Sequence, residues 1–281
     1  MHTTLVSAAD LAAHLDDPRW VICDCRHDLA DTEAGRRAYA ESHIPGARFV
    51  HLDEDLSAPK TGRNGRHPLP EPGQAARRFG ELGIDGTKRV VAYDGSGGPY
   101  AARLWWMLRW LGHDAVAVLD GGWNAWLAAR YSPSKEIPET GTARFIPRPR
   151  SEAALDVKAV AERLGTSGPL LLDARIPSRY RGENEALDPV AGHIPGAVNR
   201  PWQLNLDAEG RFKPARELRK EFGETLAGNA PDRVTHYCGS GVTACHNLLA
   251  MEVAGLAGSK LYPGSWSEWC SDPARPVVTE T

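Results

Sequence analysis

Four short apolar runs stand out along the chain, and each ends in a turn or a polar segment. Every run is too short for a typical helix and carries apolar side chains at consecutive positions. This pattern is typical of strands that are buried on both faces in a parallel sheet. The runs are "WVICDC", "KRVVAYD", "PLLLDA" and "DRVTHYC", at residues 20–25, 88–94, 169–174 and 232–238.

Two longer segments have the apolar period of a helix. "PYAARLWWMLRWLGH" begins at Pro99, a residue favoured in the first turn, and Gly112 follows its expected end. "TACHNLLAMEVAGLAG", at residues 243–258, is its counterpart. Alternating strands and helices predict an α/β fold, in which a mainly parallel sheet is flanked by helices. One face of the first helix is apolar through Ala101, Leu104, Trp105, Leu108 and Leu111.

The two halves of the sequence repeat one another. "HIPGARF" at His43 returns as "HIPGAVN" at His193, and "GWNAW" returns as "SWSEW". The apolar runs recur in the same order, so we interpret the chain as a duplication. We expect two tandem domains of one fold, at residues 1–130 and 151–281. The proline-rich segment between them, residues 131–150, is expected to be an extended linker.

Composition narrows the classes of function. The 281 residues include 33 basic and 36 acidic ones, so the net charge is −3, and neither nucleic acid nor a membrane is an expected partner. No apolar run has the length of a transmembrane helix, and the N-terminus lacks the pattern of a signal peptide. The five cysteines are sparse and odd in number, which is typical of a reducing compartment. We therefore expect a cytoplasmic protein.

The most informative cysteine is Cys238, which ends the fourth apolar run directly before a glycine-rich turn. Glycines let successive backbone N–H groups converge on one point, and the following helix adds the positive end of its dipole. Such a loop favours a thiolate and would also stabilise an anion carried by the sulfur, such as a persulfide. We predict that Cys238 is a nucleophile in an anion-binding loop. The loop consists of Gly239, Ser240, Gly241, Val242 and Thr243.

The first copy of this loop keeps the glycines but has Asp94 where Cys238 stands in the second copy. Because a carboxylate cannot accept a sulfur atom, we expect an inactive first domain and an active second domain. The same difference disfavours the alternative that Cys238 is only a buried structural cysteine.

Other interpretations of these motifs fit less well. A cysteine phosphatase needs an arginine six positions after the nucleophile, where this chain has Ala244. Cys245 lies seven positions along, too far for a simple redox pair. A dinucleotide-binding loop in the first copy would need a third glycine, where Tyr100 stands. Cys23 and Cys25 have the spacing of metal ligands, but no second pair accompanies them, so no metal is expected.

With these motifs in view, nearly the whole chain resembles the tandem-domain sulfurtransferases of the rhodanese family. The resemblance rests on "CGSGVTAC", "GHIPGA", "LDAR" and "LYPGSWSEW", together with their counterparts in the first half. It implies a two-step reaction that needs no metal or organic cofactor. Cys238 takes a sulfur atom from a small-molecule donor and becomes a persulfide, and an acceptor then removes that sulfur. The acceptors that the resemblance implies are a thiol, reduced thioredoxin or cyanide.

The loop sequence resembles the branch of the family that uses 3-mercaptopyruvate and releases pyruvate. Members that use thiosulfate typically carry basic residues directly after the cysteine, where this chain has Gly239 and Ser240. An uncharged loop attracts a dianion such as thiosulfate less strongly. Two alternatives stay open: a thiosulfate sulfurtransferase, and a non-catalytic persulfide carrier or binding module. A segment that binds the donor carboxylate favours the enzyme.

The resemblance also assigns roles to individual residues. "SRYRGE" matches the family segment whose arginine binds the donor carboxylate, which points to Arg179. Members that use mercaptopyruvate often have a second arginine further along this segment; this chain has none there, and Arg181 is a candidate substitute. Ser240 matches a serine that works with an aspartate and a histidine from the first domain. Asp55 and His67 are the matching residues.

Overall fold

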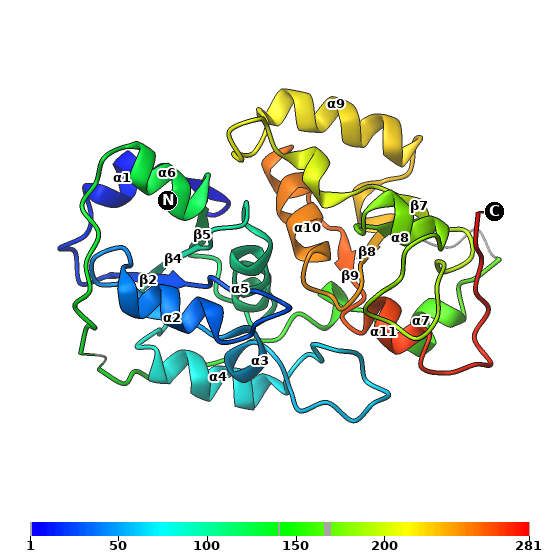
Figure 1. Cartoon of the computed structure of the whole chain (residues 1–281), viewed down its shortest axis with the longest axis horizontal. Helices are drawn as coiled ribbons and strands as arrows, with labels where there is room; N and C mark the ends of the chain where they lie inside the picture. Colours follow the sequence, from blue (N-terminus) through cyan, green and yellow to red (C-terminus); the bar gives the residue numbers. More distant parts are fainter. Residues whose placement is uncertain (1, 140, 166–169, 281) are drawn as a thin grey trace. The chain divides into compact units, whose positions relative to one another are not determined.

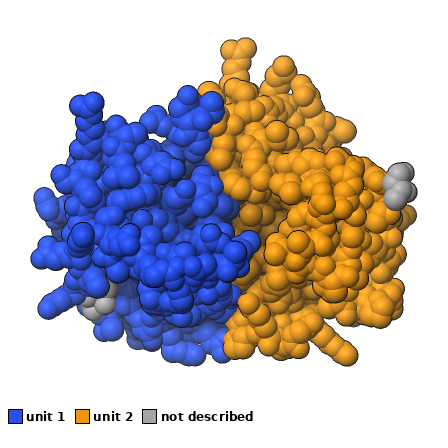
Figure 2. Space-filling model, in the orientation of Figure 1, with its two compact units in different colours: residues 1–57, 70–150, 208–212 blue, residues 58–69, 151–207, 213–281 orange. Residues whose placement is uncertain are grey.

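The computed structural model describes residues 2–139, 141–165 and 170–280. The chain forms two compact units, which Figure 1 shows as ribbons and Figure 2 in two colours. The units are not continuous in sequence. The first comprises residues 1–57, 70–150 and 208–212, and the second comprises residues 58–69, 151–207 and 213–281.

The segment expected to be a linker, residues 131–150, is part of the first unit. Its backbone is tied down by hydrogen bonds: the N–H groups of Ala143 and Arg148 donate to the carbonyls of Gly80 and Leu111. The described residues of this segment form no helix and only an isolated bridge between Ser134 and His43, and these hydrogen bonds attach the segment to its own unit.

The first unit is built on a five-stranded sheet with the strand order β1-β5-β4-β2-β3, in which all pairs are parallel. Two of the predicted apolar runs form β2 and β4, which lie side by side and are buried along almost their whole length. The strands are β1 (Leu5–Val6), β2 (Trp20–Asp24), β3 (Arg48–Phe49), β4 (Arg89–Tyr93) and β5 (Val116–Leu119). The helices are α1 (Ala8–Ala12), α2 (Ala34–Glu41), α3 (Leu52–Asp55), α4 (Pro72–Glu81), α5 (Pro99–Trp110) and α6 (Gly122–Ala128).

The second unit repeats this plan with a four-stranded parallel sheet in the order β7-β6-β8-β9. Residue Ala154 pairs with Leu261 of β9 in an isolated parallel bridge, at the place that β1 takes in the first sheet. The strands are β6 (Leu170–Asp173), β7 (Val198–Asn199), β8 (Val234–Tyr237) and β9 (Lys260–Leu261). The helices are α7 (Val157–Ala161), α8 (Pro177–Arg181), α9 (Ala215–Leu226), α10 (Ala244–Val253) and α11 (Ser265–Trp269), with 3-10 turns at Ser151–Ala153, Trp202–Asn205 and Pro231–Arg233. The predicted fold class, a parallel α/β sheet flanked by helices in each half, is confirmed.

The two helices predicted from their apolar period are the most buried ones. α5 packs on β4 and β5, and α10 packs on β8 and β9. In α5 the buried side chains extend beyond the predicted face and include the guanidinium-bearing Arg103. A helix that is apolar on nearly all sides belongs inside a domain. Among the helices described, none combines the length and the apolar character needed to cross a membrane.

The repeated "HIPGA" turns make the same contacts in both units. His43 donates through Nδ1 to the carbonyl of Tyr39 at 2.7 Å, and His193 donates to the carbonyl of Tyr180 at 2.9 Å. Each imidazole also stacks on that tyrosine ring. Contacts that recur in both units stabilise the fold rather than one active site. The same holds for the buried ion pairs after β2 and β6, Arg26 with Asp24 and Arg175 with Asp173.

Candidate active site

Cys238 lies at the carboxyl end of β8, between the strand and α10. β8 is an inner strand of its sheet, flanked by β6 and β9, and ligands of parallel sheets bind at this edge. The residue is only 2% exposed. The backbone N–H of Gly241 donates to Sγ at 3.1 Å. This N–H group thus points at the sulfur atom on which a persulfide would form.

The first residues of α11 form hydrogen bonds with the backbone of Cys238 and Gly239. The hydroxyl of Ser265 accepts the N–H of Cys238 at 3.1 Å, and the N–H of Trp266 donates to the carbonyl of Cys238 at 2.9 Å. The N–H of Ser267 donates to the carbonyl of Gly239 at 2.9 Å. The "SWSEW" motif therefore positions the backbone of Cys238 and Gly239.

The equivalent loop of the first unit reveals where its N–H groups point. The Asp94 carboxylate accepts four of them, from Ser96, Gly98, Tyr100 and Ala101, at 2.8, 2.9, 2.9 and 3.0 Å. Burial raises the pKa of Asp94, and the four N–H groups act in the opposite direction. This fold therefore directs several backbone donors at an anionic group carried by the residue that follows the strand.

Ser240 and His67 lie together. Ser240 Oγ is 2.7 Å from His67 Nδ1, and both residues are nearly buried. His67 comes from the segment 58–69, which belongs to the second unit. Asp55 lies in the first unit, where its carboxylate accepts from the backbone N–H of His51 at 2.7 Å and from Arg78 Nε at 2.6 Å. Two of the three residues suggested by the resemblance are thus paired, and the third has other partners.

Arg179, on α8, reaches the loop. A Cβ atom added to Gly239 would lie 3.2 Å from Arg179 Nη1. The other side of this guanidinium is held by two buried carboxylates. Nε and Nη2 bind Glu185, and Nη2 also binds Asp188 at 3.0 Å. Arg181 points elsewhere: it is partly exposed and forms an ion pair with Glu183 at 2.7 Å.

Sequence reasoning missed Arg66. A Cβ atom on Gly239 would lie 2.7 Å from Arg66 Nη2, and Arg66 Nη1 pairs with Asp188. The expectation of an uncharged loop needs correction. The loop residues carry no charge, but the guanidinium groups of Arg66 and Arg179 lie beside Gly239. Both arginines are far from Cys238 in the sequence, so the motif around Cys238 could not predict these charges.

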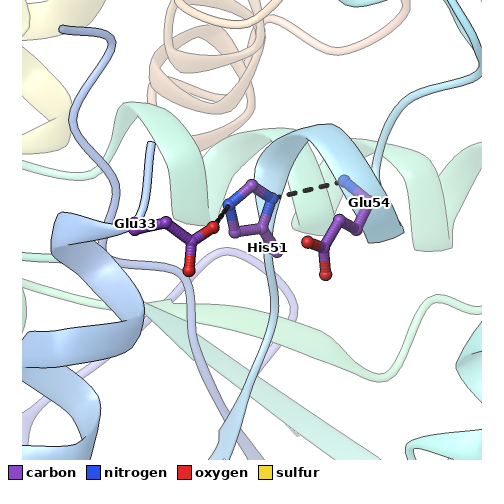
Figure 3. Close-up of side chains that lie close together, drawn as sticks. All are labelled: Glu33, His51 and Glu54. Carbon is purple, nitrogen blue, oxygen red and sulfur yellow. Dashed lines mark hydrogen bonds and ion pairs between the residues drawn. The ribbon is translucent and has the colours of Figure 1, made fainter. Parts of the chain in front are cut away.

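One cluster outside the active site has the composition of a metal site. Figure 3 shows Glu33 and Glu54 near His51. His51 Nδ1 accepts the backbone N–H groups of Asp53 and Glu54, so the proton of the neutral ring lies on Nε2. Nε2 in turn donates to the carbonyl of Thr32 at 3.0 Å. Because the lone pair of Nδ1 is engaged by two N–H groups and Nε2 carries the ring proton, these residues do not fit a metal ion.

Comparisons with known proteins agree with this geometry. The family described as "Rhodanese-like domain" matches residues 7–129 and 156–272. A probable 3-mercaptopyruvate sulfurtransferase of Pseudomonas aeruginosa is 46% identical over 98% of both chains. A putative thiosulfate sulfurtransferase of Mycobacterium tuberculosis is 39% identical over 97% of this chain and 96% of that protein. The crystal structure of a 3-mercaptopyruvate sulfurtransferase of Escherichia coli superposes with a TM-score of 0.82 at 34% identity, over 94% of this chain and 99% of that one.

Proposed function

Since the chain belongs to the family of rhodanese-like proteins and is a sulfurtransferase, we propose that it moves sulfur from 3-mercaptopyruvate to a thiol through a persulfide on Cys238. The observation that carries this proposal is the hydrogen-bonded pair of Ser240 and His67. Ser240 stands two positions after Cys238, whose sulfur accepts a backbone N–H group. Cys238 and the Ser240–His67 pair together supply a nucleophile and a proton donor at one site.

In the first step, the Cys238 thiolate attacks the sulfur of 3-mercaptopyruvate. A sulfur–sulfur bond forms, the carbon–sulfur bond breaks, and the electron pair of that bond leaves on the enolate of pyruvate. The enolate then takes a proton, for which Ser240, backed by His67, is the donor. The products are the Cys238 persulfide and pyruvate.

The backbone donors of the loop stabilise the persulfide anion. Asp94 supports this role, because the equivalent loop holds its carboxylate with four N–H groups. In the second step, an acceptor thiolate attacks the outer sulfur of the persulfide. The sulfur–sulfur bond of the persulfide breaks, the acceptor leaves as a persulfide, and the Cys238 thiolate is restored. A low-molecular-weight thiol or reduced thioredoxin would serve, and cyanide would take the sulfur as thiocyanate.

The Ser240–His67 pair also favours 3-mercaptopyruvate over thiosulfate as the sulfur donor. When thiosulfate gives up its outer sulfur, the leaving group is sulfite, which needs no proton. The enolate of pyruvate does need one. The Ser240–His67 pair is therefore useful with 3-mercaptopyruvate and dispensable with thiosulfate. Within the described residues no cysteine forms a disulfide bond, which is compatible with the reducing cytoplasm that we propose as the compartment.

Kinetics with 3-mercaptopyruvate and thiosulfate, measured side by side with one acceptor, test this proposal. We expect kcat/KM to be higher with 3-mercaptopyruvate. Cys238→Ser should abolish transfer from both donors, because an alcohol cannot form the persulfide. Mass spectrometry of the wild type after treatment with donor should find one added sulfur atom on the peptide that contains Cys238. A higher kcat/KM with thiosulfate would replace the proposed donor.

His67→Asn separates the two donors further. It should lower kcat with 3-mercaptopyruvate by about 10²-fold, the usual size of a general-acid contribution, and leave thiosulfate turnover nearly unchanged. An equal loss with both donors would mean that His67 only supports the loop. A carrier that lacks turnover would instead release a single equivalent of pyruvate and then stop, even with excess acceptor.

A further inference from the structure

Arg66 is a second charged group beside the active-site loop, and nothing in the sequence motifs assigns it a role. We propose that Arg66 and Arg179 together bind the carboxylate of the sulfur donor, which rests on the proposed function of this site. The substrate clamp is thus formed by residues from two distant segments, 58–69 and α8, both of which belong to the second unit.

Asp188 holds the two arginines together. One carboxylate oxygen, Oδ2, accepts from Arg179 Nη2 at 3.0 Å, and the other, Oδ1, accepts from Arg66 Nη1. Asp188 is nearly buried, with its side chain 2% exposed, so both ion pairs are shielded from water. This shared carboxylate orients the two guanidinium groups relative to each other.

The nitrogens that remain point to the loop. Arg179 Nη1 and Arg66 Nη2 lie within 3.2 Å of the position that a Cβ of Gly239 would take. Among the described residues, the side-chain hydrogen bonds of these two arginines use Arg66 Nη1 and Arg179 Nε and Nη2. They do not use Arg66 Nη2 or Arg179 Nη1. Two guanidinium N–H groups that converge next to the nucleophile suit the two oxygens of a carboxylate.

Gly239 completes the site because it has no side chain. The backbone at this position is not in the left-handed region, so its conformation does not require glycine. A side chain would occupy the space in front of both arginines. The absence of a Cβ therefore lets both guanidinium groups approach the loop closely, and we place the donor carboxylate beside them.

The test compares Arg66→Gln and Arg66→Lys with the wild type, using 3-mercaptopyruvate. We expect Arg66→Gln to raise KM at least tenfold and to change kcat less than threefold, because binding is lost and the chemistry is not. Arg66→Lys keeps the charge and should recover part of this loss. Arg63→Gln, an exposed arginine three positions earlier, is the matched control and should leave KM unchanged.

A binding measurement separates this inference from the proposed reaction. Pyruvate carries the same carboxylate, and titration calorimetry on Cys238→Ser measures its affinity without turnover. Adding Arg66→Gln to that protein should weaken pyruvate binding at least tenfold. If the wild type fails to use 3-mercaptopyruvate, the proposed donor is wrong. If the wild type uses it, and Arg66→Gln leaves both KM and pyruvate affinity unchanged, the clamp is overturned.

Discussion

Gly239 and Gly241 stand two positions apart in the active-site loop, but a side chain would meet different neighbours at the two positions. Gly241 has a φ of +77°, and a Cβ there would lie 2.2 Å from the backbone carbonyl of Pro263. A Cβ on Gly239 would instead meet the far end of the flexible Arg66 side chain. Gly241 is required by the backbone, whereas Gly239 is required by the two arginine side chains beside it.

The two alanine variants should therefore separate stability from binding. Gly241→Ala combines a left-handed φ with a backbone clash, so we expect it to lower the free energy of unfolding by about 2–4 kcal/mol and to abolish activity. Gly239→Ala should change that free energy by less than about 1 kcal/mol and raise KM for the donor, because Arg66 is displaced. Urea unfolding and steady-state kinetics on both variants check this. Equal destabilisation by the two variants would contradict it.

Asp94 gives a residue-scale prediction for the first unit. Asp94→Ala leaves four inward-facing N–H groups without their acceptor, so we expect the free energy of unfolding to fall by about 3 kcal/mol. Asp16→Ala, at an exposed position of the same unit, is the control and should have little effect. Urea unfolding measures both. An unchanged unfolding midpoint for Asp94→Ala would mean that water replaces the carboxylate at no cost.

At the scale of elements, β8 carries a buried titratable group behind the nucleophile. His236 is fully buried, and its Nε2 lies 3.2 Å from Met251 Sδ. Burial, with a smaller contribution from the charge of Arg200, lowers the pKa of His236 from 6.5 to about 3. Between these two values the unfolded chain binds the proton and the folded chain does not. Stability is therefore present above pH 6.5 and is lost as the pH falls toward 3.

This pKa shift predicts how stability depends on pH. Between pH 7 and pH 5, the wild type should lose about 2 kcal/mol more of its free energy of unfolding than His236→Phe does. His2→Gln, an exposed histidine, should behave like the wild type. Urea unfolding at the two pH values measures the difference. Parallel pH dependences for wild type and His236→Phe would show that the strand tolerates a charged imidazole.

At the scale of the whole molecule, the segment 58–69 is the part of the first half of the sequence that contributes residues to the active site. It lies within the first half of the sequence, but it belongs to the second unit, as Figure 2 colours it. It carries Arg66 and His67 to the loop that contains Cys238. The half of the sequence that contains Cys238 therefore lacks two of the residues that lie beside its loop.

Replacing residues 61–67 with a glycine–serine linker of the same length tests this assignment in the full chain. We expect kcat/KM with 3-mercaptopyruvate to fall at least a hundredfold, because both the proton donor and one carboxylate ligand are removed. Replacing only residues 61–65 keeps Arg66 and His67 and should retain most of the activity. Circular dichroism and urea unfolding confirm that both proteins fold. Full activity in the longer replacement would place the site outside this segment.

The sequence by itself determined the features that depend on local pattern. Burial on both faces leaves consecutive apolar residues in β2, β4, β6 and β8, so the sequence predicted these four strands and a mainly parallel sheet in each half. Duplication made the comparison of Asp94 with Cys238 possible, and a glycine-rich turn between strand and helix favours the binding of an anion. The fold class followed from these signals, and so did the proposal that Cys238 is the nucleophile.

Only the tertiary structure decided what surrounds the nucleophile. The guanidinium of Arg66 reaches Gly239 although the two residues are far apart in the chain, and a shared buried carboxylate orients it. The placement of residues 58–69 with the second unit likewise depends on long-range contacts. Such contacts leave no period or fixed spacing in the sequence. They depend on the shape and charge of segments that meet only in the folded chain. The motif around Cys238 therefore predicted a loop free of charge, whereas the folded protein surrounds it with two arginines.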